Sequence, residues 1–205
     1  MTPELKAKIK ASVEGLHGWC SVEKATTLAN LILAFKPLKV VELGVFGGKS
    51  LIPMALALQE NREGMIYGID PWKKEPCLEG KNDPKNDEWW SGVDYAGIEQ
   101  SCRDAVWGFG VTSQVKLLKG RGEDFAKDFA PGEVNLFHLD GNHSEETSVR
   151  DVNLWLPKIP AGGLVVADDV NWSTMAHAFA LLEEKCHLLF LNQNVGTHWA
   201  VFRKR

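Results

Sequence analysis

The fold is indicated by one stretch, Val41-Glu42-Leu43-Gly44-Val45-Phe46-Gly47-Gly48-Lys49-Ser50. An apolar run that starts at residue 39 ends in it, closely spaced glycines follow, and a helical pattern begins at its last serine. This order is typical of a ligand-binding turn, because glycine lets the backbone approach a ligand and a helix N-terminus favours negative charge. A purely structural glycine turn would look the same, so the rest of the chain must decide.

Apolar runs alternate with helical patterns on both sides of this stretch. Strands are predicted over residues 39–43, 65–70, 115–118, 134–139, 163–167, 186–191 and 198–203. Helices are predicted over residues 21–35, 50–59, 92–107, 122–129, 144–156 and 173–184, the first capped by Ser21 and burying Leu28, Leu31, Ile32 and Phe35. Repeated βα units indicate an α/β protein with a parallel sheet, and a final hairpin through residues 192–197 adds an antiparallel strand. Ligands of such sheets bind at the carboxyl ends of the strands.

Composition bounds the possible functions. The chain has 205 residues, 44% hydrophobic and 24% charged, as expected for one domain over residues 1–205. Its net charge of −4 argues against a primary nucleic-acid binder. Apolar runs fall short of the ~20 residues that span a membrane, and the polar start does not resemble a signal peptide. The 4 cysteines are widely spaced, which predicts reduced thiols in a cytoplasmic protein rather than disulfides or a zinc site.

Two phosphate-binding motifs nearly match the glycine stretch. The last three positions of a P-loop, G-x-x-x-x-G-K-[ST], match residues 48–50, but Leu43 occupies the position of its first glycine. A dinucleotide fingerprint, G-x-G-x-x-G, requires glycines where Phe46 and Lys49 stand. Both motifs therefore miss. The run 134–140 still resembles the acidic strand that accompanies a P-loop, which keeps a phosphotransferase as an alternative.

Glu42 supports a third interpretation, because an acid at the end of a buried strand is costly unless it binds a polar partner. An acid followed by Gly-x-Phe-x-Gly-x-Ser resembles the first motif of class I S-adenosylmethionine-dependent methyltransferases, most of all the branch with the catechol and macrocin-type O-methyltransferases. The resemblance implies that Glu42 holds the amino group and Ser50 the carboxylate of the cofactor's methionine moiety. Gly44, Phe46 and Gly48 would line the cofactor. It also implies a Rossmann-like class I methyltransferase fold, a seven-stranded, mostly parallel sheet with an antiparallel last strand.

The resemblance continues at the next strand ends. Asp70 ends a run that resembles the second motif, whose acid accepts the ribose hydroxyls. Trp72 is then a candidate for the adenine face, or alternatively an anchor for the loop that follows. Gly122 lies after the third predicted strand, where the family places adenine contacts, although Arg121 departs from the small or acidic residue of that pattern. Asp140, after the fourth predicted strand, also belongs to the implied cofactor site.

Acidic residues end the fourth and fifth predicted strands: Asp140, and the pair Asp168 and Asp169. Adjacent parallel strands open onto the same edge, so these carboxylates are expected to converge. Unpaired like charges repel one another, and a bound cation resolves the repulsion. Oxygen ligands favour Mg²⁺, Ca²⁺ or Mn²⁺ over zinc. The residues thus predict a divalent-metal site, with helix N-capping by Asp140 or Asp169 as the structural alternative.

This acidic cluster resembles the metal site of metal-dependent O-methyltransferases, which place one Asp at the fourth strand end and an Asp-Asp or Asp-Asn pair at the fifth. Asn142 stands where the macrocin type has Asp, a departure that puts a carboxylate base there in doubt. His143 has the offset of the catalytic lysine of catechol-type enzymes, and a histidine pKa of ~6.5 suits it as a base. It could instead cap the helix that starts at Ser144. Structural or surface positions are expected for the other histidines, His17, His138, His177, His187 and His198.

The resemblance implies methyl transfer from S-adenosylmethionine to a hydroxyl of a small molecule of sugar, polyketide or phenolic type, assisted by a divalent metal, with His143 as base. Residues 1–38 would form N-terminal helices and residues 71–91 a lid, with Trp89 and Trp90 facing an apolar or ring-bearing acceptor. A partner subunit, as in a homodimer, could complete the pocket of so short a chain. The alternatives are the phosphotransferase and a cofactor-binding accessory protein without activity.

Overall fold

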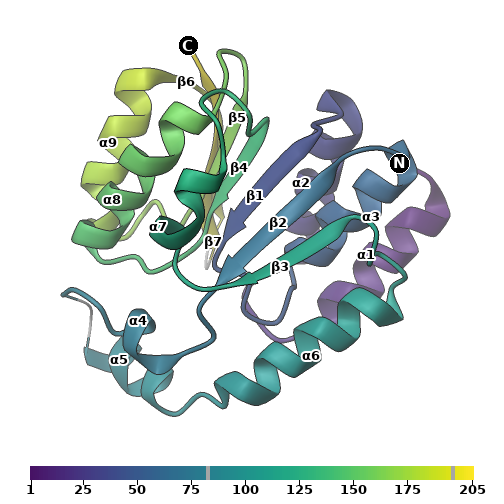
Figure 1. Cartoon of the computed structure of the whole chain (residues 1–205), viewed down its shortest axis with the longest axis horizontal. Helices are drawn as coiled ribbons and strands as arrows, with labels where there is room; N and C mark the ends of the chain where they lie inside the picture. The colour runs from purple at the N-terminus through teal and green to yellow at the C-terminus, as the bar shows by residue number, and fades with distance from the viewer. Residues whose placement is uncertain (82–83, 195–196) are drawn as a thin grey trace.

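A single mixed sheet forms the centre of the molecule in the computed structural model, which describes residues 1–81, 84–194 and 197–205 (Figure 1). Within these residues, a 7-stranded sheet has the order β3-β2-β1-β4-β5-β7-β6. The strands are β1 Lys39–Leu43, β2 Met65–Asp70, β3 Val115–Lys119, β4 Leu136–Leu139, β5 Leu164–Asp168, β6 Cys186–Asn194 and β7 Thr197–Lys204. β1 to β5 pair in parallel, whereas β7 runs antiparallel to β5 and β6. The predicted fold class is therefore confirmed.

Helices cover both faces of the sheet (Figure 1). One face carries α1 Pro3–Gly15, α2 Val22–Phe35, α3 Leu51–Asn61 and α6 Tyr95–Gly108, and the other carries α7 Gly122–Phe125, α8 Glu145–Trp155 and α9 Ala176–Lys185. Short 3-10 turns flank the second group at Ala126–Asp128, Leu156–Lys158 and Ser173–Met175. Two short helices, α4 Lys74–Cys77 and α5 Pro84–Ser91, lie off the carboxyl ends of the strands.

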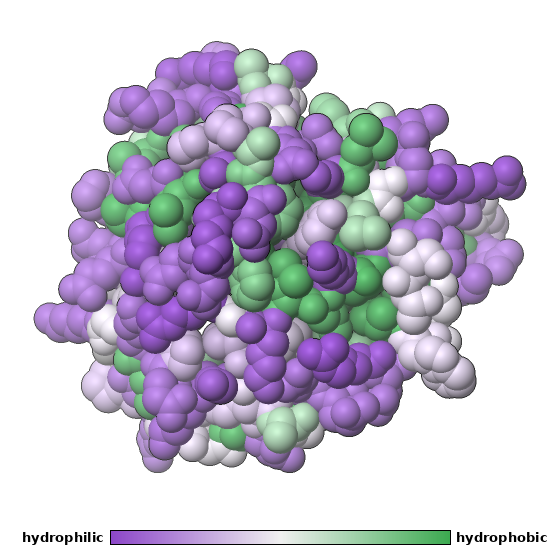
Figure 2. Space-filling view, viewed as in Figure 1, coloured by the Kyte–Doolittle hydropathy of each residue, from purple (hydrophilic) through white to green (hydrophobic). Residues whose placement is uncertain are grey.

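The strands bury apolar side chains on both faces of the sheet. Successive side chains of a strand point to opposite faces, so Val40 of β1 packs into the core under α1–α3 and α6, while Val41 packs into the core under α7–α9. Burial on both sides explains why the central strands read as nearly continuous apolar runs. Figure 2 shows that hydrophilic residues cover most of this face of the molecule, with hydrophobic residues near its middle.

Local sequence signals placed several elements well. β1 and β2 begin and end at the predicted residues. Ser21 caps α2, since its hydroxyl accepts a hydrogen bond from the backbone N–H of Lys24 at 3.1 Å. The predicted buried face of α2 needs correction, however: Phe35 is 50% exposed, whereas Lys24 is buried beside Leu28. Phe35 is the last residue of the helix, directly before its left-handed cap at Lys36, so it extends past the packed turns.

The two irregular segments also differ from prediction. Residues 71–91 contain α4 and α5 rather than one continuous loop, and Asn82 and Asp83 lie outside the described residues. The final strands are longer than predicted, because β6 continues to Asn194 and β7 begins at residue 197. Of the predicted turn, residues 195–196 lie outside the described part of the chain. Among the described helices, none has the length and apolar character that crossing a membrane requires.

Candidate functional site

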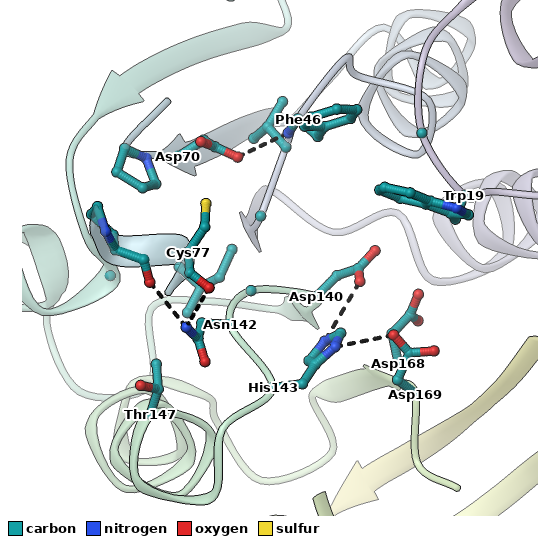
Figure 3. Close-up of a pocket in the computed structure, with 18 of the residues that line it drawn as sticks. Trp19, Phe46, Asp70, Cys77, Asp140, Asn142, His143, Thr147, Asp168 and Asp169 are labelled. Carbon is teal, nitrogen blue, oxygen red and sulfur yellow. Dashed lines mark hydrogen bonds and ion pairs between the residues drawn. The ribbon is translucent and has the colours of Figure 1, made fainter. Parts of the chain in front are cut away.

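A cavity of about 450 Å³ opens at the carboxyl ends of the central strands. Its wall includes Phe46 from the glycine loop after β1, Asp70 from the end of β2, and Asp140 from the residue after β4. Asp168, the last residue of β5, and Cys77, the last residue of α4, complete the ring drawn in Figure 3. Segments that are far apart in the sequence therefore share one cavity, at the edge where α/β sheets bind ligands.

Backbone strain is concentrated at this edge. Phe46 (φ 48°), Trp72 (φ 41°) and Asp169 (φ 51°) have left-handed backbones and follow β1, β2 and β5 respectively. Such conformations cost about 1–3 kcal/mol each and persist only where the surroundings enforce them. Elsewhere in the described chain, left-handed non-glycine residues are helix caps, namely Lys36 and Arg62. The strain thus marks the strand ends around the cavity as a functional site.

Asp70 organises the glycine loop. Its Oδ2 accepts a hydrogen bond from the backbone N–H of Phe46 at 2.9 Å, and its Oδ1 accepts one from Trp72 at 2.7 Å. Burial raises the pKa of Asp70 to about 6, although these N–H groups act in the opposite direction. Gly44 is required beside it, because a Cβ there would lie 1.8 Å from the backbone oxygen of Asp140.

The cavity wall brings together most of the residues predicted to hold a cofactor: Gly44, Phe46, Ser50, Asp70, Gly122 and Asp140. Glu42 is fully buried and reaches the cavity through Ser50, whose hydroxyl donates to it at 2.5 Å. Gly48 packs against Cys102 instead, since a Cβ there would lie 3.1 Å from its Sγ. The adenine role predicted for Trp72 needs correction: its indole is buried and donates to the carbonyl oxygen of Phe46 at 2.9 Å. Trp72 therefore anchors the glycine loop.

The carboxylates of Asp140 and Asp168 lie close together, and a lysine forms ion pairs with both. Lys24, in the first turn of α2, contacts Asp168 Oδ2 through Nζ and lies 3.7 Å from Asp140 Oδ2, with 1% of its side chain exposed. On the other side of Asp168, His138 Nε2 lies 3.3 Å from Oδ1. His138 Nδ1 lies 2.8 Å from Glu42 Oε1, which links this network to the glycine loop.

Neighbouring charges shift the pKa values of the residues in this network. Burial acts to raise the pKa of Asp168, but Lys24 and His138 hold it well below its usual range. Burial and the nearby negative charge of Asp168 raise the pKa of Asp140 to about 8. Burial lowers the pKa of His138, but its hydrogen bonds to Asp168 and Glu42 outweigh burial and bring it to about 9. The negative charge of the strand ends is thus compensated from within the chain.

His143 connects the two outer acids of the cluster (Figure 3). Its Nδ1 lies 3.0 Å from Asp169 Oδ2, and its Nε2 lies 3.8 Å from Asp140 Oδ1. Nε2 is buried and has no hydrogen-bond partner among the described residues. A neutral ring that donates its Nδ1–H to Asp169 keeps the lone pair of Nε2 unpaired.

The arrangement does not fit a divalent cation in the predicted position. Mg²⁺ requires ligand oxygens at about 2.0–2.1 Å in octahedral geometry, and the ammonium of Lys24 already engages oxygens of Asp140 and Asp168. The described residues offer two sets of possible ligands: His138, Asp140 and Asp168, and Asp140, His143 and Asp169. In the first set Asp168 already contacts Lys24 and His138, and in the second set His143 and Asp169 contact each other. Lys24 supplies positive charge to two of the three carboxylates that were expected to be unpaired.

Two departures from the family pattern hold the segment around α4 against the cavity. The amide of Asn142 donates hydrogen bonds to the carbonyl oxygens of Pro76 and Glu79, at 2.9 and 3.0 Å. It also donates to the carbonyl oxygen of Cys77 at 3.2 Å (Figure 3). An aspartate at this position could not donate them. Arg121 pairs with the carboxylate of Glu79 at 2.6 Å, and Arg150 pairs with it at 2.9 Å. These contacts hold the segment around α4 beside the cavity.

Aromatic side chains line the mouth of the cavity. The ring of Trp19 stacks on Phe46, with centroids 5.6 Å apart, and meets Trp89 edge-on at 4.6 Å. Trp90 packs at right angles to Trp89, with centroids 4.9 Å apart. Trp89 and Trp90 thus line the cavity, and Trp19, which sequence reasoning missed, joins them.

Lys24 and His138 were also missed, although the sequence carries a signal for each. Lys24 lies four residues before Leu28, on the apolar stripe of its helix, where an unpaired ammonium is too costly to bury. His138 interrupts an apolar strand, as Glu42 does, and the two are direct neighbours in the register of β1 and β4. A polar residue within a buried run requires a partner, and His138 and Glu42 are partners of each other.

Solved structures share this fold over the whole chain. Cofactor-bound Rv0187 from MTB has a TM-score of 0.70 and 18% sequence identity, and the match covers 100% of this chain and 91% of that chain. The O-methyltransferase TomG from Streptomyces achromogenes, involved in tomaymycin synthesis and solved in complex with SAM, has a TM-score of 0.67 and 16% identity, with coverage of 100% and 91%. At such identities the likeness establishes the fold alone.

Sequence comparison identifies the family. The uncharacterized protein R132 of Acanthamoeba polyphaga mimivirus is 28% identical over 156 residues, or 71% of this chain, and this chain spans 60% of that protein's length. A family profile described as "Methyltransferase domain" matches residues 41–170, which include the glycine loop, Asp70, Asp140, His143 and Asp169. Because the match covers more than half of the chain and all of these strand ends, the chain belongs to this family of methyltransferase domains.

Proposed function

We propose that this chain is an S-adenosylmethionine-dependent O-methyltransferase that methylates a hydroxyl group of a small molecule. The observation that carries the proposal is the imidazole of His143. His143 lies in the wall of the cavity, and its Nδ1 lies 3.0 Å from Asp169 Oδ2. Its buried Nε2 has no hydrogen-bond partner among the described residues. An imidazole oriented by a carboxylate, with its second nitrogen unpartnered at a cavity wall, has the arrangement that a general base requires.

The cofactor fits the other side of the cavity. Asp70 accepts hydrogen bonds from the backbone N–H groups of Phe46, Trp72 and Val45. A carboxylate has about four acceptor positions, so it can still accept a hydrogen bond from a ribose hydroxyl. Gly44 and Phe46 would line the cofactor, and Ser50 would contact its methionine moiety. When bound, S-adenosylmethionine supplies an electrophilic methyl group on a positively charged sulfur. The phosphotransferase alternative gains no support, since the family match covers the glycine loop.

His143 would hold the proton of the acceptor hydroxyl. Burial lowers the pKa of this histidine, but the hydrogen bond to Asp169 and the charges of Asp140 and Asp168 outweigh burial, so the pKa lies above its usual 6.5. The imidazolium that forms when Nε2 takes the proton is thus stabilised where it arises. The general base contributes about 10²–10⁴ in rate in comparable enzymes.

The aromatic side chains at the cavity mouth support an apolar or ring-bearing acceptor. Trp19, Phe46 and Trp89 present their rings within 6.1 Å of one another. Rings of this kind bury large apolar area and favour stacked or edge-on contact with another ring. A phenol or a polyketide ring meets this requirement, and the apolar face of a sugar also fits.

Methyl-labelled S-adenosylmethionine, incubated with the chain and a panel of phenols, polyketide alcohols and sugars, tests the proposal. We expect label to transfer to the oxygen of at least one ring-bearing acceptor, and replacement of His143 by alanine to suppress that transfer while S-adenosylhomocysteine still binds. Label that ends on nitrogen or carbon, or transfer that survives the loss of His143, would contradict it.

A further inference from the structure

Lys24 is the most enclosed charge of the site. Its ammonium touches Asp168 and lies 3.7 Å from Asp140, and 1% of its side chain is exposed. Lysines are almost never buried to this extent unless they are paired. The side chain extends from the first turn of α2, whose Leu28 and Ile32 lie in the same core cluster as Val40 and Val166 of the sheet, so the helix fixes the ammonium at the ends of β4 and β5.

The negative charges around Lys24 are compensated in part by positive charges of the same network. Four carboxylates lie in the connected network, those of Glu42, Asp140, Asp168 and Asp169. Lys24 provides a permanent positive charge among them, and the imidazoles of His138 and His143 lie against the same carboxylates. A divalent cation added here would meet an ammonium at the oxygens it needs as ligands, and two positive centres on one carboxylate oxygen repel each other.

We propose that the ammonium of Lys24 takes the place of a divalent cation between Asp140 and Asp168, so that this methyltransferase works without a metal. The inference rests on the proposed methyl transfer to a hydroxyl and makes it more specific. An ammonium compensates the strand-end carboxylates but does not coordinate the acceptor oxygen. Deprotonation then falls to His143, and the acceptor needs one hydroxyl rather than two adjacent oxygens that chelate a metal. Lys24 is a positioning residue, because it acts through the carboxylates that it holds.

Titration of Mn²⁺ into the full chain saturated with S-adenosylhomocysteine tests this inference, with bound metal measured by electron paramagnetic resonance. We expect no saturable binding by the wild type up to about 1 mM, a range in which even weak carboxylate sites bind their metals. Lys24→Met removes the ammonium and keeps the size of the side chain, and it should gain a saturable Mn²⁺ signal that the wild type lacks. A merely structural lysine would not produce this gain.

Lys39→Met is the matched control, because Lys39 forms an ion pair with Glu133 that lies outside the cavity. It should bind no Mn²⁺. Saturable binding by the wild type would overturn the inference, and so would a folded Lys24→Met chain that binds no Mn²⁺. The wild-type titration decides the question even if Lys24→Met fails to fold. Loss of S-adenosylhomocysteine binding would instead count against the proposed function, so the two failures are distinguishable.

Discussion

The two sides of the cavity are held in place by different interactions. Backbone conformation and backbone N–H groups shape the side formed by β1 and β2, whereas ion pairs between side chains shape the side formed by β4 and β5. Gly44 and Phe46 adopt left-handed backbones on the first side, and Asp70 is held there by N–H groups of the loop. On the second side, Lys24 and Asp168 lie within a network of acids and bases. The first side suits a cofactor that is bound by shape, and the second suits proton transfer.

Removal of the base should have the largest effect on the charged side. We expect His143→Ala to lower the rate of methyl transfer by about 10²–10⁴, because Nε2 would no longer take the proton of the acceptor. S-adenosylhomocysteine affinity should change little, since it depends on the other side of the cavity. His177→Ala is the control, because His177 is exposed and pairs with Glu145 at 3.3 Å. A loss below tenfold for His143→Ala would reduce this residue to a structural role.

The charged side should also make folding stability depend on pH. The folded-state pKa of His138 is raised from 6.5 to about 9, so its contribution is complete below pH 6.5 and is lost as pH rises through 9. A shift of this size corresponds to about 3 kcal/mol. The raised pKa of Asp140 acts in the same direction. Urea unfolding across this range should show falling stability, and a free energy of unfolding that is constant or rises would contradict the ionised network.

Substitutions on the side formed by β1 and β2 should change the affinity for the cofactor. Asp70→Asn removes the charge of the acceptor that we propose for the ribose hydroxyls, so S-adenosylhomocysteine should bind about ten- to a hundredfold more weakly in calorimetry. In the wild type, Asp70 becomes protonated as pH falls through about 6, and affinity should decline there. The asparagine variant should not show that decline. Equal affinities of the two chains at neutral pH would place the ribose elsewhere.

Loss of the hydrogen bonds between Asn142 and the segment around α4 should have the smallest effect. Asn142→Asp replaces a donor by a carboxylate that faces the carbonyl oxygens of Pro76 and Glu79. Each lost hydrogen bond is worth about 1 kcal/mol, so the segment around α4 should open more often. Amide hydrogen exchange in Lys74–Cys77 should accelerate in the variant, while exchange in β1 should stay unchanged. Unaltered exchange around α4 would show that Asn142 does not hold the lid.

The two sides also differ in how far the sequence predicts them. The glycine loop and Asp70 follow local rules, since a strand end, a tight turn and a helix start lie within a few residues of one another. Asp140, Asp168 and Asp169 were placed at one edge by the parallel topology alone. Lys24 could not be placed there, because its contact with Asp168 spans 144 residues and depends on how α2 packs on the sheet. The contacts of Asn142 and Arg121 likewise depend on the path of the segment around α4, which no local pattern gives.

A crystal structure with bound S-adenosylhomocysteine tests the central claim most directly. We expect both ribose hydroxyls to lie within hydrogen-bond distance of Asp70 and the sulfur to face the side of the cavity where His143 Nε2 lies, with Lys24 still on Asp168. A ligand bound outside this cavity, or one whose sulfur points away from His143, would contradict it.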